Sequence, residues 1–234
     1  MKTIAYKYET HLHTSPVSKC AKSTVREMLE FYKGLGYEGI FVTNHFIQGN
    51  MTKPEGASYE ELVEFYFSDY EEALRLSPEI GIRVFLGVEI SYGGTDFLIF
   101  GLDKAWYLDH PEILDMRFSD ELRLMRDAGA FISQAHPFRE AAYIDHIRLF
   151  PRCIEAVEVI NACRLGFEND MAAHYAEAYG LLKTAGSDIH CAPTQKRLAG
   201  ITTERPIKDE LDFINMLRKG EVQIFTEELE KAVE

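Results

Sequence analysis

Two histidines, His11 and His13, stand two residues apart at the end of a segment in which apolar and polar residues alternate. The alternation predicts a half-buried strand over residues 4–9, and residues two apart on an extended chain point to the same face. Two imidazoles on one face can bind a single metal ion. An H-x-H pair is equally consistent with a solvated strand end, so its meaning depends on the rest of the chain.

Other polar residues stand at or near the ends of further apolar runs. They are His45, Glu89, Asp96, His136, Asp188 and His190. Glu89 closes a strongly apolar run, and a carboxylate there is costly to bury unless it is paired or bound to a metal. Asp188 and His190 repeat the two-residue spacing of the first pair. Asp96 is ambiguous, because the Gly-Gly-Thr-Asp stretch that contains it is also a good turn.

Helical and extended patterns alternate six or seven times along the chain, which predicts a parallel α/β sheet, closed into a barrel or left open. The predicted strands are 4–9, 39–43, 83–89, 97–100, 130–134, 156–160, 181–185, a short segment near 201, and 222–225. The predicted helices begin near 24, 58, 119, 167 and 209, the first two at capping boxes. In a barrel of this kind the active site is built at the carboxyl ends of the strands.

Length and composition narrow the functional classes. The chain has 234 residues, 46% of them hydrophobic, which is enough for one core, so we expect a single domain over 1–234. A net charge of −13 argues against non-specific nucleic-acid binding. We find no signal-peptide-like start and no membrane-spanning run. The four cysteines lack a disulfide framework, so we expect reduced thiols in a cytoplasmic protein.

Five motifs, in order, resemble those of the PHP (polymerase and histidinol phosphatase) superfamily of metal-dependent phosphoesterases. They are His11-Leu-His13-Thr14, Val42-Thr-Asn-His45, Gly87-Val-Glu89, Ala135-His136-Pro137 and Gly186-Ser-Asp188-Ile-His190. Together they extend over roughly residues 8–202. The resemblance implies a distorted (β/α)7 TIM-like barrel that holds two to three divalent ions. The implied ligands are His11, His13, Cys20, His45, Glu89, Asp96, His136, Asp188 and His190.

Three residues depart from the choices common in that family. Cys20 stands where Asp or His is frequent, Asp96 stands where many members have His, and Asn44 replaces the Asp that usually precedes the third histidine. We expect Asn44 to change the support of the ligands rather than the ligands themselves. Histidines with a thiolate favour zinc or iron, whereas carboxylates accept manganese, so the metal identity stays open.

The resemblance implies hydrolysis of a small phosphate monoester, such as histidinol phosphate, a nucleotide or a sugar phosphate, by a metal-bridging hydroxide. Glu89 would bridge two ions, and Asp188 and His190 would complete the catalytic set. Arg139, Arg164 and Asn161 follow predicted strand ends and are expected to bind the anionic substrate. Two alternatives stay open: an amidohydrolase-type C–N hydrolase, and a non-catalytic metal-binding regulatory domain. The oligomeric state is not predicted.

Overall fold

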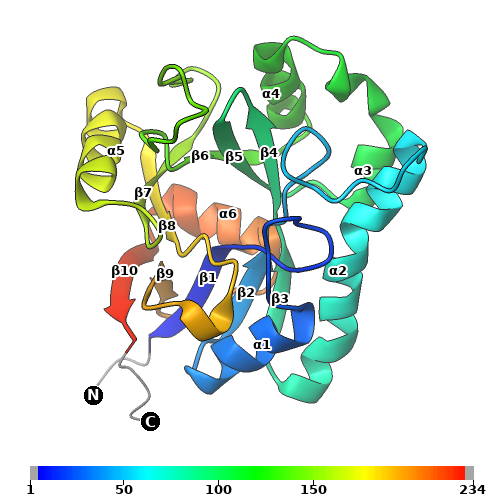
Figure 1. The fold of residues 1–234 in the computed structure, drawn as a ribbon. Helices are drawn as coiled ribbons and strands as arrows, with labels where there is room; N and C mark the ends of the chain where they lie inside the picture. The colour runs from blue at the N-terminus through cyan, green and yellow to red at the C-terminus, as the bar shows by residue number, and fades with distance from the viewer. Residues whose placement is uncertain (1–4, 230–234) are drawn as a thin grey trace.

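The computed structural model describes residues 5–229, and its strands form two five-stranded sheets at the centre of the molecule (Figure 1). The first sheet has the order β10-β9-β1-β2-β3, with strands Val222–Glu228, Arg197–Thr203, Tyr6–Leu12, Gly39–Val42 and Arg83–Leu86. The second has the order β4-β5-β6-β7-β8, with strands Val88–Tyr92, Thr95–Phe100, Phe131–Ala135, Ala156–Asn161 and Leu182–Gly186. Ile4, where the first predicted strand begins, lies outside the described residues.

Six α-helices accompany these strands in the described part of the chain. They are α1 Val25–Gly34, α2 Tyr59–Ile80, α3 Lys104–Asp109, α4 Phe118–Asp127, α5 Gly166–Tyr179 and α6 Glu210–Lys219, with short 3-10 turns at Pro111–Leu114 and Ala192–Thr194. Both predicted capping boxes are present, at Thr24 and at Ser58. Helix α3 is not among the helices predicted from the sequence. Helix α6 lies behind the strands in the view of Figure 1, and its Phe213 contacts Phe41 of the first sheet and Phe100 of the second.

The expectation of a parallel sheet is only partly correct. Neighbours β1–β2, β2–β3, β6–β7 and β7–β8 are parallel, but β4–β5, β5–β6, β1–β9 and β9–β10 are antiparallel. Strands β4 and β5 form a hairpin because Gly93 and Gly94 connect them at φ angles of 57° and 84°. This left-handed backbone suits a two-residue hairpin turn, which leaves no room for a crossover helix.

The predicted strand 83–89 is divided between the two sheets at Gly87. A Cβ atom at this position would lie 2.6 Å from Thr43 Cγ2 and 2.9 Å from Phe100 Cε1, so only glycine fits where the chain passes between the sheets. We expected Glu89 to end a strand, but it is the second residue of β4. Asp96 likewise lies within β5 rather than before it.

The two sheets meet at both of their seams through isolated bridges. Leu12 at the end of β1 pairs with Ile189 after β8, and His45 after β2 pairs with Glu89 of β4. The α/β class is therefore confirmed. Within residues 5–229 the strands are grouped in two sheets instead of one continuous closed barrel. Both seams carry predicted metal ligands, which brings residues distant in sequence together.

Candidate metal centre

Eight of the nine predicted ligands converge in four overlapping groups. The groups are His13 with His45 and His190, His11 with His13 and Glu89, His11 with His136 and Asp188, and Glu89 with Asp96 and His136. Within each group the nitrogen or oxygen ligand atoms all lie within 4.8 Å of one another. Seven of these eight residues are buried, and His190 is half-buried. The shared members make the four groups one connected centre.

The H-x-H pair behaves as the strand geometry predicts. The side chains of His11 and His13 are both fully buried, and their Nε2 atoms lie 3.3 Å apart. Asp188 Oδ1 lies 3.6 Å from His11 Nε2 and 3.3 Å from His13 Nε2. Two imidazoles and one carboxylate thus face a common point, as divalent-metal ligands do.

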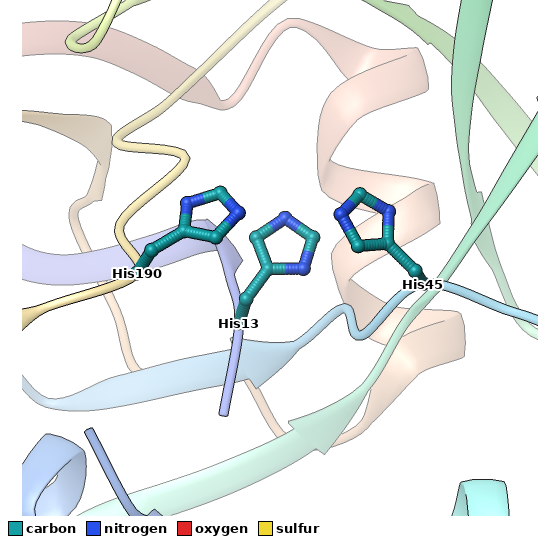
Figure 2. Close-up of side chains that lie close together, drawn as sticks. All are labelled: His13, His45 and His190. Carbon is teal, nitrogen blue, oxygen red and sulfur yellow. The ribbon is translucent and has the colours of Figure 1, made fainter. Parts of the chain in front are cut away.

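A second group surrounds the other side of His13. Figure 2 shows the imidazole of His13 between those of His45 and His190, which come from the loops after β2 and β8. Each outer ring centre lies 4.3 Å from that of His13. Burial, with the charges of His45 and His190, holds the pKa of His13 well below its usual range. The neutral form of His13 that results is the form that binds a metal ion.

Glu89 occupies the middle of the centre. Its Oε1 lies 3.1 Å from His11 Nε2 and 3.7 Å from His136 Nε2, while its Oε2 lies 3.6 Å from His13 Nε2 and also contacts His45 Nδ1. Neither carboxylate oxygen has a hydrogen-bond partner of acceptable geometry. Burial raises the pKa of Glu89, but the surrounding imidazoles, His45 first, outweigh it and hold that pKa well below its usual range. A buried anion with unpartnered oxygens needs a cation close by.

Asp96 and His136 form the side of the centre next to β5 and β6. His136 Nε2 lies 3.7 Å from Asp96 Oδ2, and Arg139 Nη2 lies 2.9 Å from the same oxygen. The other oxygen, Asp96 Oδ1, accepts a hydrogen bond of 2.6 Å from Ser91 Oγ. Asp96 is therefore within reach of a shared metal, but it is also paired with an arginine.

Two of the candidate ligands have an unusual backbone. His136 and Asp188 have φ angles of 26° and 54°, and they are the two non-glycine residues with positive φ in the described chain. Such conformations cost of the order of 1 kcal/mol or more and are concentrated at functional sites. Hydrogen bonds hold both residues: Asp188 N donates to His11 O at 2.7 Å, and His136 N donates to Glu158 Oε2 at 3.1 Å.

Glu158 contacts two of the candidate ligands, His11 and His136, and is not among the residues predicted from the sequence. Its side chain is fully buried, and its Oε1 lies 2.8 Å from His11 Nδ1. Its Oε2 accepts a hydrogen bond of 2.9 Å from Asn161 Nδ2. Asn161 Nδ2 also lies 3.3 Å from Asp188 Oδ2, so this predicted substrate-binding residue is buried beneath the ligands in contact with Asp188. A carboxylate that fixes the second nitrogen of a metal-binding histidine orients its ring.

A second supporting network involves the unusual Asn44. Its Oδ1 accepts from Ser18 Oγ at 2.8 Å, and its Nδ2 donates to Asp69 Oδ2 at 3.1 Å. Ser18 Oγ in turn lies 3.2 Å from His13 Nδ1 and accepts from His45 N at 3.1 Å. Asn44 thus acts through Ser18, as expected for a residue that supports ligands. Ser18 and Asp69 are not among the residues predicted from the sequence, because neither follows an apolar run at a strand end.

Cys20 is the ninth predicted ligand, and it lies in the loop between β1 and α1, where it lines the same cavity as His45 and His190. Burial raises the pKa of its thiol, but the imidazoles of His190 and His45 outweigh it and lower that pKa to about 6. The thiol is therefore close to two histidines of the His13 group, although it is not itself a member of the four groups.

The centre opens into a cavity of about 520 Å³. Arg139 and Arg164, both predicted substrate-binding residues, line it together with Tyr143 and the ligand Asp188. The Nε atoms of both arginines are buried without a hydrogen-bond partner. Two guanidinium groups beside a group of metal ligands provide the positive charge that an anionic substrate needs.

Comparisons with known proteins bear on this arrangement. Residues 166–222 match the family model described as PHP-associated. The fold resembles that of a two-domain protein from Bacteroides vulgatus containing a predicted PHP-like metal-dependent phosphoesterase, with 15% identity, a TM-score of 0.70 and coverage of 95% of this chain and 65% of that one. A proposed metal-dependent phosphoesterase from Bifidobacterium adolescentis is 14% identical, with a TM-score of 0.55 and coverage of 81% and 89%.

These comparisons support the resemblance of the chain to the PHP superfamily, through residues 166–222 and through the fold. The chain spans 65% of the length of the first protein, which has a second domain. Among curated proteins, none matches the sequence.

A further solved structure with a similar fold belongs to a protein named for a different activity. An amidohydrolase from Chromobacterium violaceum, with bound sulfate and no metal, is 15% identical to this chain, with a TM-score of 0.56 and coverage of 92% of this chain and 97% of that one. At this identity the likeness concerns the fold alone. Within residues 5–229, the helices are all too short or too polar to cross a membrane.

Proposed function

We propose that this chain is a metal-dependent phosphoesterase of the PHP superfamily that hydrolyses a small phosphate monoester. The observation that carries the proposal is Glu89, a fully buried carboxylate whose two unpartnered oxygens face different pairs of histidines. That geometry suits a ligand shared by two cations. The adjoining cavity, with two arginines in its lining, suits a phosphate group. A distorted PHP-type barrel, with its two sheets joined at the seams, remains our description of the scaffold.

The donor set fits divalent ions, and we expect two to three of them, drawn from zinc, manganese and iron. When bound, such ions would activate water and neutralise charge on the phosphate oxygens. The nine predicted ligands would hold them, with Glu89 as the bridging residue. Asp188 and His190 both line the cavity, which supports keeping them in the catalytic set.

Arg139 and Arg164 would position the substrate. The Nε atoms of both guanidinium groups are buried without a partner, so a phosphate oxygen would satisfy groups that the protein leaves unpaired. Arg139 already binds Asp96 through Nη2 at 2.9 Å, which fixes its guanidinium beside the ligands. Asn161 is fully buried, and its contacts with Glu158 and Asp188 favour a supporting role over direct substrate contact.

The amidohydrolase alternative requires a bridging lysine after a middle strand. Lys104, which follows β5 in the chain, lies at the start of α3 and pairs with Glu64 and Glu71 of α2 at 2.5 and 2.7 Å. In the part of the chain that the structure describes, no lysine lines the cavity of the centre. These observations favour the phosphoesterase.

A phosphate-release panel tests the proposal. Histidinol phosphate, nucleoside monophosphates, sugar phosphates and phosphotyrosine would each be assayed with manganese, zinc and iron, and metal content would be measured in the same samples. We expect release of phosphate from at least one class, and loss of that activity in His11→Ala and Asp188→Ala with the fold retained. Bound metal without hydrolysis of any ester would favour a regulatory domain, and full activity in either variant would refute the assigned site.

A further inference from the structure

The loop between β1 and α1 brings a thiol to the most histidine-rich part of the centre. Lys22 N donates to His190 O at 2.7 Å, and Lys19 N donates to Asn50 O at 2.9 Å. These two bonds fix the loop on both sides of Cys20, next to the His190 backbone. Cys20 then lines the cavity with His45 and His190. Backbone hydrogen bonds therefore fix the position of Cys20 beside these two histidines.

Two observations that do not involve Cys20 point to a cation in this part of the centre. His45 Nδ1 is buried, lacks a hydrogen-bond partner of acceptable geometry, and lies against Glu89 Oε2, which also lacks one. The three imidazoles of His13, His45 and His190 crowd together in Figure 2 with ligand atoms within 4.8 Å. A metal ion between them would provide the cation that the buried, unpartnered His45 Nδ1 and Glu89 Oε2 lack.

The neighbouring group has a different chemical character. It consists of Glu89, Asp96 and His136, two carboxylates and one imidazole. Carboxylates are hard ligands that accept manganese and magnesium, whereas thiolates are soft ligands that select zinc, and imidazoles suit zinc well. The two ends of the centre thus differ in softness, with Glu89 between them.

We propose that His13, His45, His190 and Cys20 form a soft metal position that selects zinc, while the Glu89, Asp96 and His136 group accepts a harder ion such as manganese. The protein would then hold two kinds of metal ion at once, sorted by ligand chemistry. The inference rests on the metal centre of the proposed function. Its test measures metal binding alone, so it can succeed or fail independently of hydrolysis.

The first measurement is a competition. Metal-stripped protein would be loaded with manganese in large excess over a limiting amount of zinc, dialysed, and analysed for both metals. We expect the wild-type chain to retain close to one zinc per chain, and Cys20→Ser to bind that zinc at least about tenfold more weakly. Cys163→Ser is the matched control, because Cys163 is another thiol beside the centre, with its Sγ 3.5 Å from Asp188 O. Equal zinc retention in the wild-type chain and Cys20→Ser would overturn the proposal.

The second measurement uses cobalt as a spectroscopic substitute for zinc. A thiolate ligand produces a sulfur-to-cobalt charge-transfer band, which we expect in the wild-type chain and in Cys163→Ser but not in Cys20→Ser. Cys20→Asp keeps a ligand at the position but makes it hard, so we expect it to bind manganese in place of zinc, which separates lost ligation from lost folding. Absence of the band in the wild-type chain, its persistence in Cys20→Ser, or its loss in Cys163→Ser would each refute the role of Cys20.

Discussion

Replacement of Glu158 by Gln should weaken metal binding without removing any ligand. Glu158 Oε1 lies 2.8 Å from His11 Nδ1, and Glu158 Oε2 accepts from His136 N at 3.1 Å and from Asn161 Nδ2 at 2.9 Å. A glutamine has only one acceptor oxygen, so its NH₂ group must face one of these donors. The ring of His11 or the strained backbone of His136 then loses its fixed orientation. Loss of such support lowers metal affinity by about 10–100-fold, which corresponds to roughly 1.4–2.7 kcal/mol.

Metal titration by calorimetry, with circular dichroism to check the fold, measures this effect. Phosphate release should fall at limiting metal and recover at saturating metal, because the ligands themselves remain. Glu155→Gln is the matched control: the same substitution three residues earlier affects a partly exposed carboxylate that pairs with Arg218 at 2.7 Å on the protein surface. Unchanged metal affinity in a folded Glu158→Gln protein would refute the argument that Glu158 orients His11.

Three further predictions follow from buried groups. Burial raises the pKa of Glu121 from 4.5 to about 8, so this group stabilises the fold fully below about pH 4.5 and loses that contribution as the pH rises toward 8. Glu121→Gln can still bond with Gln48, so its free energy of unfolding should exceed that of the wild-type chain by a few kcal/mol at pH 8 but not at pH 5. Denaturant titrations at both pH values measure this difference, and a difference that does not change with pH would contradict the argument. Gly87→Ala should lower the free energy of unfolding by about 1–3 kcal/mol in the same titration, because the new Cβ would lie 2.6 Å from Thr43 Cγ2. Unchanged stability would show that the two sheets can move apart at this position. Removal of metal ions by a chelator should lower the melting temperature by roughly 10 °C, for a metal present at about a thousand times its dissociation constant. An unchanged melting curve would count against a bound ion.

Local patterns predicted much of the scaffold because they depend on neighbours in sequence. Capping boxes at Thr24 and Ser58 set the starts of α1 and α2, and His11, His45 and His136 lie at or just beyond strand ends as expected. The order of the motifs indicated a resemblance to the PHP superfamily, which the family model over residues 166–222 and the similar fold support. The convergence of the ligands required tertiary structure, since it depends on two seams between sheets.

The errors in the predicted fold arise where contacts between distant parts of the chain override the local pattern. The run from Arg83 to Glu89 reads as one strand because its apolar pattern is unbroken, and the clash that forces a crossing at Gly87 comes from Thr43 and Phe100, far away in sequence. The Gly93-Gly94 turn is consistent with antiparallel pairing of β4 and β5. The regular alternation of strands and helices in the rest of the sequence favours parallel pairing instead. Asp96 consequently lies in β5, opposite Ser91 of the hairpin.

The buried carboxylates show where sequence reasoning must stop. The cost of burial singled out Glu89, and the same argument applies to Glu9 and Glu158, which also stand in strands and are fully buried. Glu9 is satisfied within the protein: it accepts from Tyr32 OH at 2.6 Å and from backbone N–H groups, including that of His11 at 2.8 Å. Glu158 is satisfied by an imidazole, a backbone N–H and an amide. Only the oxygens of Glu89, of the three, lack hydrogen-bond partners. A sequence can therefore show that each carboxylate needs a partner, but the hydrogen bonds of the folded protein are what favour a metal at Glu89 and supporting roles for the other two.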